Sequence, residues 1–128
     1  MAVLDAALVL GGGAIGAPVR YLTDRAVQRR HETAFPWGTI TVNILGTLVL
    51  GLLTGTLVAA AAPHSVLMIV GVGFCGALTT YSTFSYETLR LWEDGAAFYA
   101  VANVVISVGA ALGAAFTGSA IAQSIWPR

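Results

Sequence analysis

The sequence contains two long stretches without a charged side chain. No Asp, Glu, Lys or Arg occurs at positions 33–86, and none occurs at positions 95–127. Each stretch is longer than the roughly 20 residues that an α-helix needs to cross the hydrocarbon core of a bilayer. With 57% hydrophobic and only 9% charged residues, the chain is predicted to be an all-α, multi-pass integral membrane protein.

Polar and proline-containing segments divide the chain into four apolar helices of one transmembrane domain, residues 1–128. The predicted helices occupy about residues 4–22, 37–62, 66–86 and 96–125. Residues 23–34 are expected to form the main loop, with a short interfacial helix as the alternative, and residues 89–95 form the last loop. Pro18 is placed near the end of the first helix, where a break costs least.

The third apolar segment holds an unusual run at positions 71–87, GVGFCGALTTYSTFSYE. Its glycines and its consecutive hydroxyl side chains lower helix propensity, so we expect a break in the helix near residues 76–80. Irregular backbone at membrane depth is tolerated only where protein buries it or a water-filled cavity meets it. The run therefore predicts a functional site.

Polar side chains also occur in the other helices. Tyr99, Asn103 and Ser107 recur every four residues and share one helix face, and Asn43 lies in the second helix. Arg20, at the end of the first helix, either attracts anions into a vestibule or snorkels to the headgroups, and both interpretations stay open. Four packed helices fill their own centre, so an oligomer is expected.

Four motifs carry a resemblance to a known family: GGxxGAxxRY at 12–21, PWGTITVNILG at 36–46, GFCGALTTYSTFSYE at 73–87 and YxxxNxxxS at 99–107. Together they resemble the Fluc family of fluoride channels, also called CrcB proteins, over nearly the whole chain. The resemblance implies a passive, fluoride-selective channel that exports fluoride across the plasma membrane and forms an antiparallel, dual-topology dimer with two pores.

The resemblance also implies roles for single residues. A structural Na⁺ at the dimer interface would be held by backbone carbonyls of Gly76 and Thr79. The family's pore aromatics correspond to Tyr81 and Phe84, although the first of the pair is usually phenylalanine. The pore asparagine corresponds to Asn43, and the polar track of the fourth helix corresponds to Asn103 and Ser107.

Fluoride is strongly hydrated, so a pore has to replace its water with donors and positive dipole ends. Donors of the right kind are Asn43, Thr80, Ser82, Thr83 and Ser107, and aromatic ring edges also face anions. The alternatives are that the aromatics form core, that the asparagines join helices, and that Ser85 bonds its own backbone. Glu87 is interpreted as a solvated carboxylate, with a pore-mouth role as the alternative.

Other site types are disfavoured by the residues present. His31 and His64 are expected in loops without partner spacing for a metal, and Cys75 is interpreted as a packing residue. A net charge of zero without a basic block argues against nucleic acid. An enzyme is not expected, because no catalytic constellation lies at membrane depth.

Two other functions remain as alternatives: a small four-helix, proton-coupled multidrug exporter and a non-transporting accessory subunit. The exporter needs an embedded carboxylate, and no Asp or Glu is expected inside a span. The arginines gather on one side, which places the first and third loops in the cytoplasm and both termini outside. Such a bias suggests a heterodimer with an oppositely oriented paralogue, and a homodimer is the family's usual form.

Overall fold

The computed structural model describes residues 2–31, 33–58 and 62–126. In this part of the chain four helical segments are long and apolar enough to cross a membrane, as predicted. They are α1 (Ala2–Arg29), α2 (Trp37–Val58), a composite third segment and α6 (Ala97–Ile125). The third segment consists of α3 (His64–Val66), the π-helix η1 (Leu67–Cys75), α4 (Gly76–Leu78) and α5 (Ser82–Glu93).

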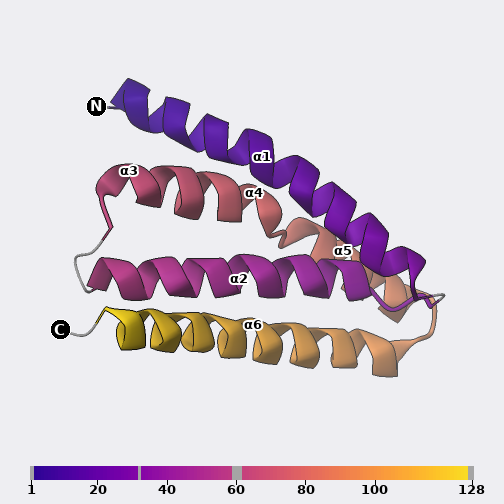
Figure 1. Cartoon of the computed structure of the whole chain (residues 1–128). Coiled ribbons are helices and arrows are strands. Elements are labelled where there is room, and N and C mark those ends of the chain that lie inside the picture. The colour runs from indigo at the N-terminus through magenta and orange to yellow at the C-terminus, as the bar shows by residue number, and fades with distance from the viewer. Residues whose placement is uncertain (1, 32, 59–61, 127–128) are drawn as a thin grey trace.

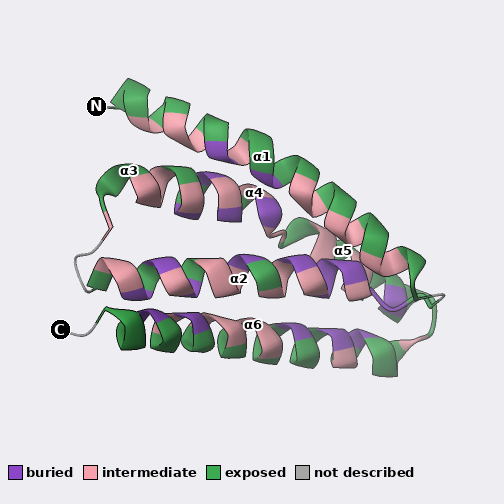
Figure 2. Cartoon of the chain, in the orientation of Figure 1, coloured by how far each residue is buried: buried purple, intermediate pink, exposed green. Residues whose placement is uncertain are grey.

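The segments run alternately up and down, so both chain ends lie at the same end of the bundle (Figure 1). Helix α2 lies between the composite third segment and α6, and the buried residues line the sides on which the helices face one another (Figure 2). The backbones of α2 and α6 come into contact at glycine positions. A Cβ on Gly51, for example, would overlap the carbonyl oxygen of Ala115 on α6. Small residues therefore set the α2–α6 spacing.

Helix α1 is longer than predicted. It continues through Pro18 to Arg29, so the expected loop at 23–34 is wrong for most of its length. This polar segment has no glycine or proline, and the Arg25 guanidinium donates to the Tyr21 hydroxyl one turn earlier at 2.8 Å. The change to polar residues indicates where the chain leaves the apolar region, but the helix continues beyond that point to Arg29.

The predicted loop at 89–95 is also mostly helical, because α5 continues past residue 86 to Glu93. Gly95 follows the end of α5, and its φ of 82° suits glycine. The Ala96 N–H bonds the Leu91 carbonyl at 2.9 Å, and the Gly95 N–H bonds the Trp92 carbonyl at 3.2 Å. Helix α2 ends at Val58, and residues 59–61 of its predicted extension lie outside the described residues.

After the short α3, the third segment continues as the π-helix η1, where an ordinary helix was expected. Helical geometry stops at Leu78 and resumes at Ser82. Thr79 is extended, with φ −82° and ψ 157°, whereas Gly76 keeps helical angles of −62° and −38°. The irregular backbone therefore consists of residues 79–81, which carry hydroxyl groups, rather than of the glycine.

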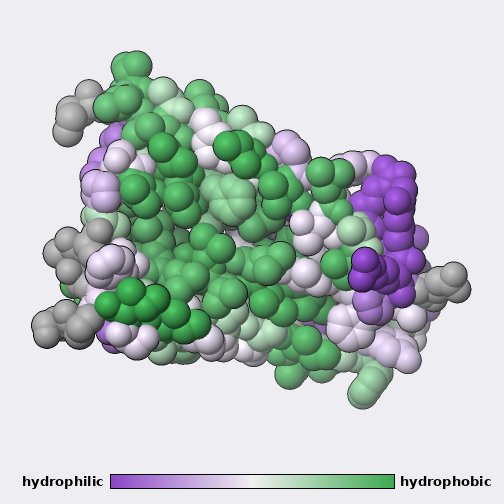
Figure 3. Space-filling view, viewed as in Figure 1, coloured by the Kyte–Doolittle hydropathy of each residue, from purple (hydrophilic) through white to green (hydrophobic). Residues whose placement is uncertain are grey.

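The outer surface is apolar across the middle of the bundle and hydrophilic at the end where α1 and α5 finish (Figure 3). Large side chains such as Phe98, Phe116 and Val3 are mostly exposed. A soluble monomer rarely exposes so much contiguous apolar surface. This surface therefore suits lipid or another subunit.

Candidate functional site

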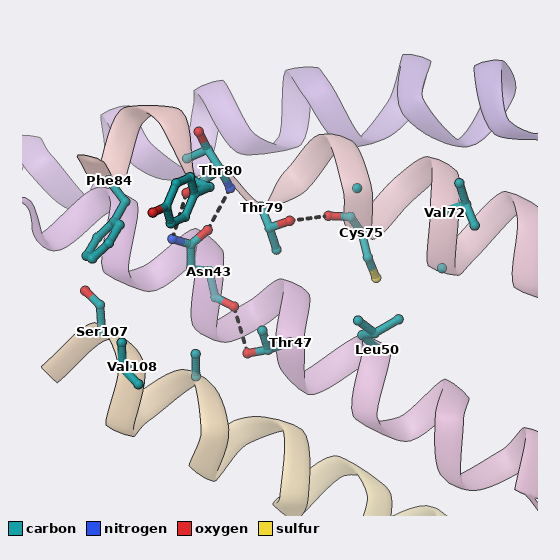
Figure 4. Close-up of a pocket in the computed structure, with 14 residues that line it drawn as sticks. Asn43, Thr47, Leu50, Val72, Cys75, Thr79, Thr80, Phe84, Ser107 and Val108 are labelled. Carbon is teal, nitrogen blue, oxygen red and sulfur yellow. Dashed lines mark hydrogen bonds between the residues drawn. The ribbon is translucent and has the colours of Figure 1, made fainter. Parts of the chain in front are cut away.

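The interruption of the third segment opens onto a cavity of about 410 Å³. Helices α2 and α6 and the third segment form its walls (Figure 4). Five of the predicted path residues line it, namely Asn43, Thr80, Tyr81, Phe84 and Ser107. The two residues assigned to the sodium site, Gly76 and Thr79, line it as well. Thr47, Cys75 and several apolar residues complete the wall.

Asn43 joins α2 to the interrupted backbone. Its Nδ2 donates to the Thr80 carbonyl at 3.1 Å, and its Oδ1 accepts the Thr80 N–H at 2.8 Å (Figure 4). Both backbone groups of Thr80 have lost their helical partners at this point, and buried backbone groups without partners are costly. Asn43 thus stabilises the irregular segment while its amide also faces the cavity.

Thr80 also caps the start of α5. Its Oγ1 accepts the Thr83 N–H at 3.2 Å and donates to Thr83 Oγ1 at 3.1 Å. A hydroxyl three residues before a free N–H is a favourable N-terminal cap. Ser82 is exposed, with its Oγ 3.4 Å from Thr80 Oγ1. The hydroxyl groups of Thr80, Ser82 and Thr83 therefore interact with one another and do not all point into the cavity.

The two aromatic residues lie side by side at one end of the cavity. The ring centroids of Tyr81 and Phe84 are 6.0 Å apart with an angle of 47° between the planes. Tyr81 is 80% exposed, and Phe84 is half-buried and points from α5 toward Ser107 on α6 (Figure 4). The Phe84 ring therefore forms the part of the cavity wall that faces Ser107 of α6.

Asn103 and Ser107, two polar residues on one face of α6, have different surroundings. Ser107 lines the cavity, whereas Asn103 is fully buried and is absent from the cavity wall. Asn103 donates to Thr88 Oγ1 at 2.8 Å and accepts from the Ser107 hydroxyl at 3.1 Å. Thr88 was missed from the sequence, because it falls after the predicted end of the third helix.

A smaller pocket of about 210 Å³ lies on the other side of the hydroxyl run, between α1 and α2. Arg20 lines it together with Thr80 and Thr83, and so do Tyr21, Asp24, Thr39 and other residues. Thr80 therefore contributes to both cavities. Arg20 therefore lines a pocket that shares Thr80 with the larger cavity.

Two expectations about charged groups are corrected. Glu87 is half-buried inside the third apolar segment and accepts a hydrogen bond from Thr39, so it is not a freely solvated carboxylate. His64 begins α3 and its Nε2 lies 3.1 Å from Asp5 Oδ1. Among the described residues no three His, Cys, Asp or Glu side chains form a metal-binding group.

The fold and the cavity define a small multi-pass membrane protein with a polar site where one span is interrupted. Residues 7–119 match the family model described as CrcB-like protein, Camphor Resistance (CrcB). The chain belongs to this CrcB-like family.

Similar proteins are named as channels. A fluoride-specific ion channel, FluC 1, of Streptomyces avermitilis is 60% identical over 119 residues, covering 93% of this chain and 96% of the relative. FluC 1 of Frankia casuarinae is 60% identical over 124 residues, with 93% and 96% covered. FluC 2 of Mycobacterium tuberculosis is 48% identical over 111 residues, with 87% and 85% covered.

Proposed function

We propose that this protein is a fluoride-selective ion channel of the cell membrane, through which fluoride leaves the cell passively. The observation that carries the proposal is the cavity itself, in which aromatic rings and amide and hydroxyl groups meet beside an interrupted span. Identity of 60% to named fluoride channels over nearly the whole chain supports the same conclusion. The chain is thus a channel and not an enzyme.

Fluoride selectivity requires a wall that replaces tightly held water without binding the ion permanently. The described residues that line the cavity carry no charged side chain, so an anion would meet the amide of Asn43, hydroxyls and the positive edges of Tyr81 and Phe84. Most of these donors already have partners within the chain. An ion therefore competes with existing hydrogen bonds, which keeps each site weak enough for release.

A second subunit is part of the proposal. The cavity is bounded on its outer side by exposed residues, among them Tyr81, Val72 and Val108. An exposed apolar face beside a proposed ion path suits a second subunit, which would shield the ion from lipid. We therefore place an antiparallel partner over this face, which makes two equivalent paths in the dimer. Gly109 and Gly113 of α6 have open space beside them and permit a close approach.

The distribution of arginines between the two ends of the bundle bears on whether the partner is a paralogue or a second copy. Arg25, Arg29, Arg30 and Arg90 belong to the ends of α1 and α5, whereas Asp5 and His64 belong to the opposite end; Arg128 lies outside the described residues. This asymmetry supports an oppositely oriented paralogue, and the homodimer is the simpler assembly. Fluoride transport by the purified chain alone would remove the need for a paralogue.

A structural Na⁺ belongs to the same proposal, with the carbonyls of Gly76 and Thr79 as ligands. The Thr80 N–H, which in a continuous helix would bond the Gly76 carbonyl, donates to Asn43 instead. Gly76 is exposed and has nothing within 4 Å of a built Cβ. Hard cations favour carbonyl oxygens of this kind. Na⁺ would supply positive charge that joins the two interrupted segments of a dimer.

The test is ion efflux from liposomes that contain the purified protein. Fluoride loss, measured with an electrode, is expected to be far greater than the loss from protein-free liposomes. Chloride loss under the same gradient should stay at background. Folded dimeric protein that passes no fluoride, or that passes chloride equally well, would contradict the proposal.

A further inference from the structure

A chain of hydrogen bonds connects two residues of the cavity wall through two residues outside it. The Ser107 hydroxyl donates to Asn103 Oδ1 at 3.1 Å, and Asn103 Nδ2 donates to Thr88 Oγ1 at 2.8 Å. Thr88 Oγ1 in turn donates to the Phe84 carbonyl at 2.8 Å. Ser107 and Phe84 line the cavity, whereas Thr88 and Asn103 do not.

The direction of donation along this chain has a consequence for the cavity. A threonine hydroxyl has one hydrogen, and Thr88 gives it to Phe84, so Thr88 can only accept from Asn103. The amide nitrogen of Asn103 therefore faces Thr88, and its oxygen faces Ser107. Ser107 gives its hydrogen to that oxygen. In this arrangement Ser107 presents lone pairs to the cavity, which repel an anion.

A second arrangement satisfies the same groups. If Thr88 turns its hydrogen to Asn103, the amide can rotate so that its oxygen accepts from Thr88 and its nitrogen donates to Ser107. The Ser107 hydrogen is then free to donate into the cavity. The Phe84 carbonyl loses only the side-chain bond, because it lies within α5 and keeps its backbone bond. No proton is transferred, and no buried group is left unpaired.

We propose that Thr88 is a positioning residue, whose single hydroxyl hydrogen sets whether Ser107 offers a donor or an acceptor to an anion in the cavity. Asn103 is fully buried, so water cannot replace either of its partners. Donation along a connected chain also strengthens each bond in it. This inference rests on the proposed channel function and adds a residue that acts on the ion only through Asn103 and Ser107.

The test compares fluoride efflux over a range of fluoride concentrations. Thr88→Val keeps the shape of the side chain and removes the hydroxyl, and it should lower efflux or raise the half-saturating concentration about tenfold. Thr88→Ser should restore efflux to within about twofold of the original. Ser107→Ala should lower fluoride efflux about as much as Thr88→Val does. The double variant should lower it no more than either single substitution.

Thr56→Val is the matched control, since Thr56 makes the same kind of bond to the Leu52 carbonyl, at 2.8 Å, on α2, and does not line the cavity. It should conduct normally. If Thr88→Val fails to assemble, Thr88→Cys, with its weak S–H donor, takes its place with the same expected loss.

Normal efflux by Thr88→Val, or losses that multiply in the double variant, would overturn the role of Thr88 while leaving the channel function intact. An unmodified protein that passes no fluoride would overturn the channel function and this inference together.

Discussion

Asn43 and Thr80 hold each other through both ends of one amide. Asn43 Nδ2 lies 3.1 Å from the Thr80 carbonyl oxygen, and Asn43 Oδ1 lies 2.8 Å from the Thr80 nitrogen. The amide thereby takes the place of the two helical neighbours that Thr80 lacks. An asparagine is suited to this task because it carries a donor and an acceptor on one short, rigid group.

Asn43→Asp should therefore disable the channel. The carboxylate keeps an acceptor for the Thr80 N–H but loses the donor and places negative charge against the Thr80 carbonyl. We expect a loss of stability of about 1–3 kcal/mol and little fluoride efflux. Thr41→Val, which removes a hydroxyl bonded to its own helix at 2.8 Å, is the control and should behave normally. Wild-type stability and efflux in Asn43→Asp would refute the bridging role.

Tyr81→Phe should retain activity. Tyr81 is 80% exposed, and its ring packs beside the Phe84 ring, with the two ring centroids 6.0 Å apart. Removing the hydroxyl leaves that ring edge unchanged, so fluoride efflux within about twofold of the original is expected, which corresponds to less than the value of one hydrogen bond. A tenfold loss would show that the phenol hydroxyl contacts the ion or the partner subunit.

Gly51→Ala should destabilise the subunit, because the added methyl group would overlap the Ala115 carbonyl oxygen across the α2–α6 contact. Overpacking of this kind costs about 1–3 kcal/mol. Gly11→Ala on α1, where nothing lies within 4 Å of a built Cβ, should leave the subunit as stable or slightly more so. Thermal unfolding in detergent would measure both, and equal effects would contradict the packing described for α2 and α6.

Removal of Na⁺ should weaken the dimer. Prolonged exchange of Na⁺ for an organic cation at constant ionic strength should lower the apparent unfolding temperature and fluoride efflux, and both should recover when Na⁺ returns. Binding of an ion stabilises the form that binds it. Exhaustive exchange without any change in either quantity would argue against a cation on the Gly76 and Thr79 carbonyls.

Hydropathy predicted the four membrane-spanning segments, because uncharged length is what a bilayer demands. It did not predict where helices end. Helix α1 extends to Arg29 and α5 to Glu93, since a helix that leaves the bilayer still satisfies its own backbone. The end of α5 is instead set by Gly95, whose positive φ permits the terminal hydrogen bonds.

Residue type and family motifs selected half of the cavity wall, including Asn43, Phe84 and Ser107. They did not show which groups bond one another. Asn43 and Thr80 are 37 positions apart, and a preference for polar residues carries no information about such a pair. The Thr88–Asn103 and Thr39–Glu87 bonds were missed for the same reason, because both depend on helices meeting in space.

Fluoride efflux from liposomes by Phe84→Ile tests whether the cavity lined by Phe84 is the fluoride path. Isoleucine fills similar space but has no ring edge to offer an anion. Phe116→Ile, an exposed site on α6 away from the cavity, is the control. We predict that Phe84→Ile assembles normally and passes almost no fluoride, while Phe116→Ile conducts as the original does. Full fluoride efflux through Phe84→Ile would contradict the account.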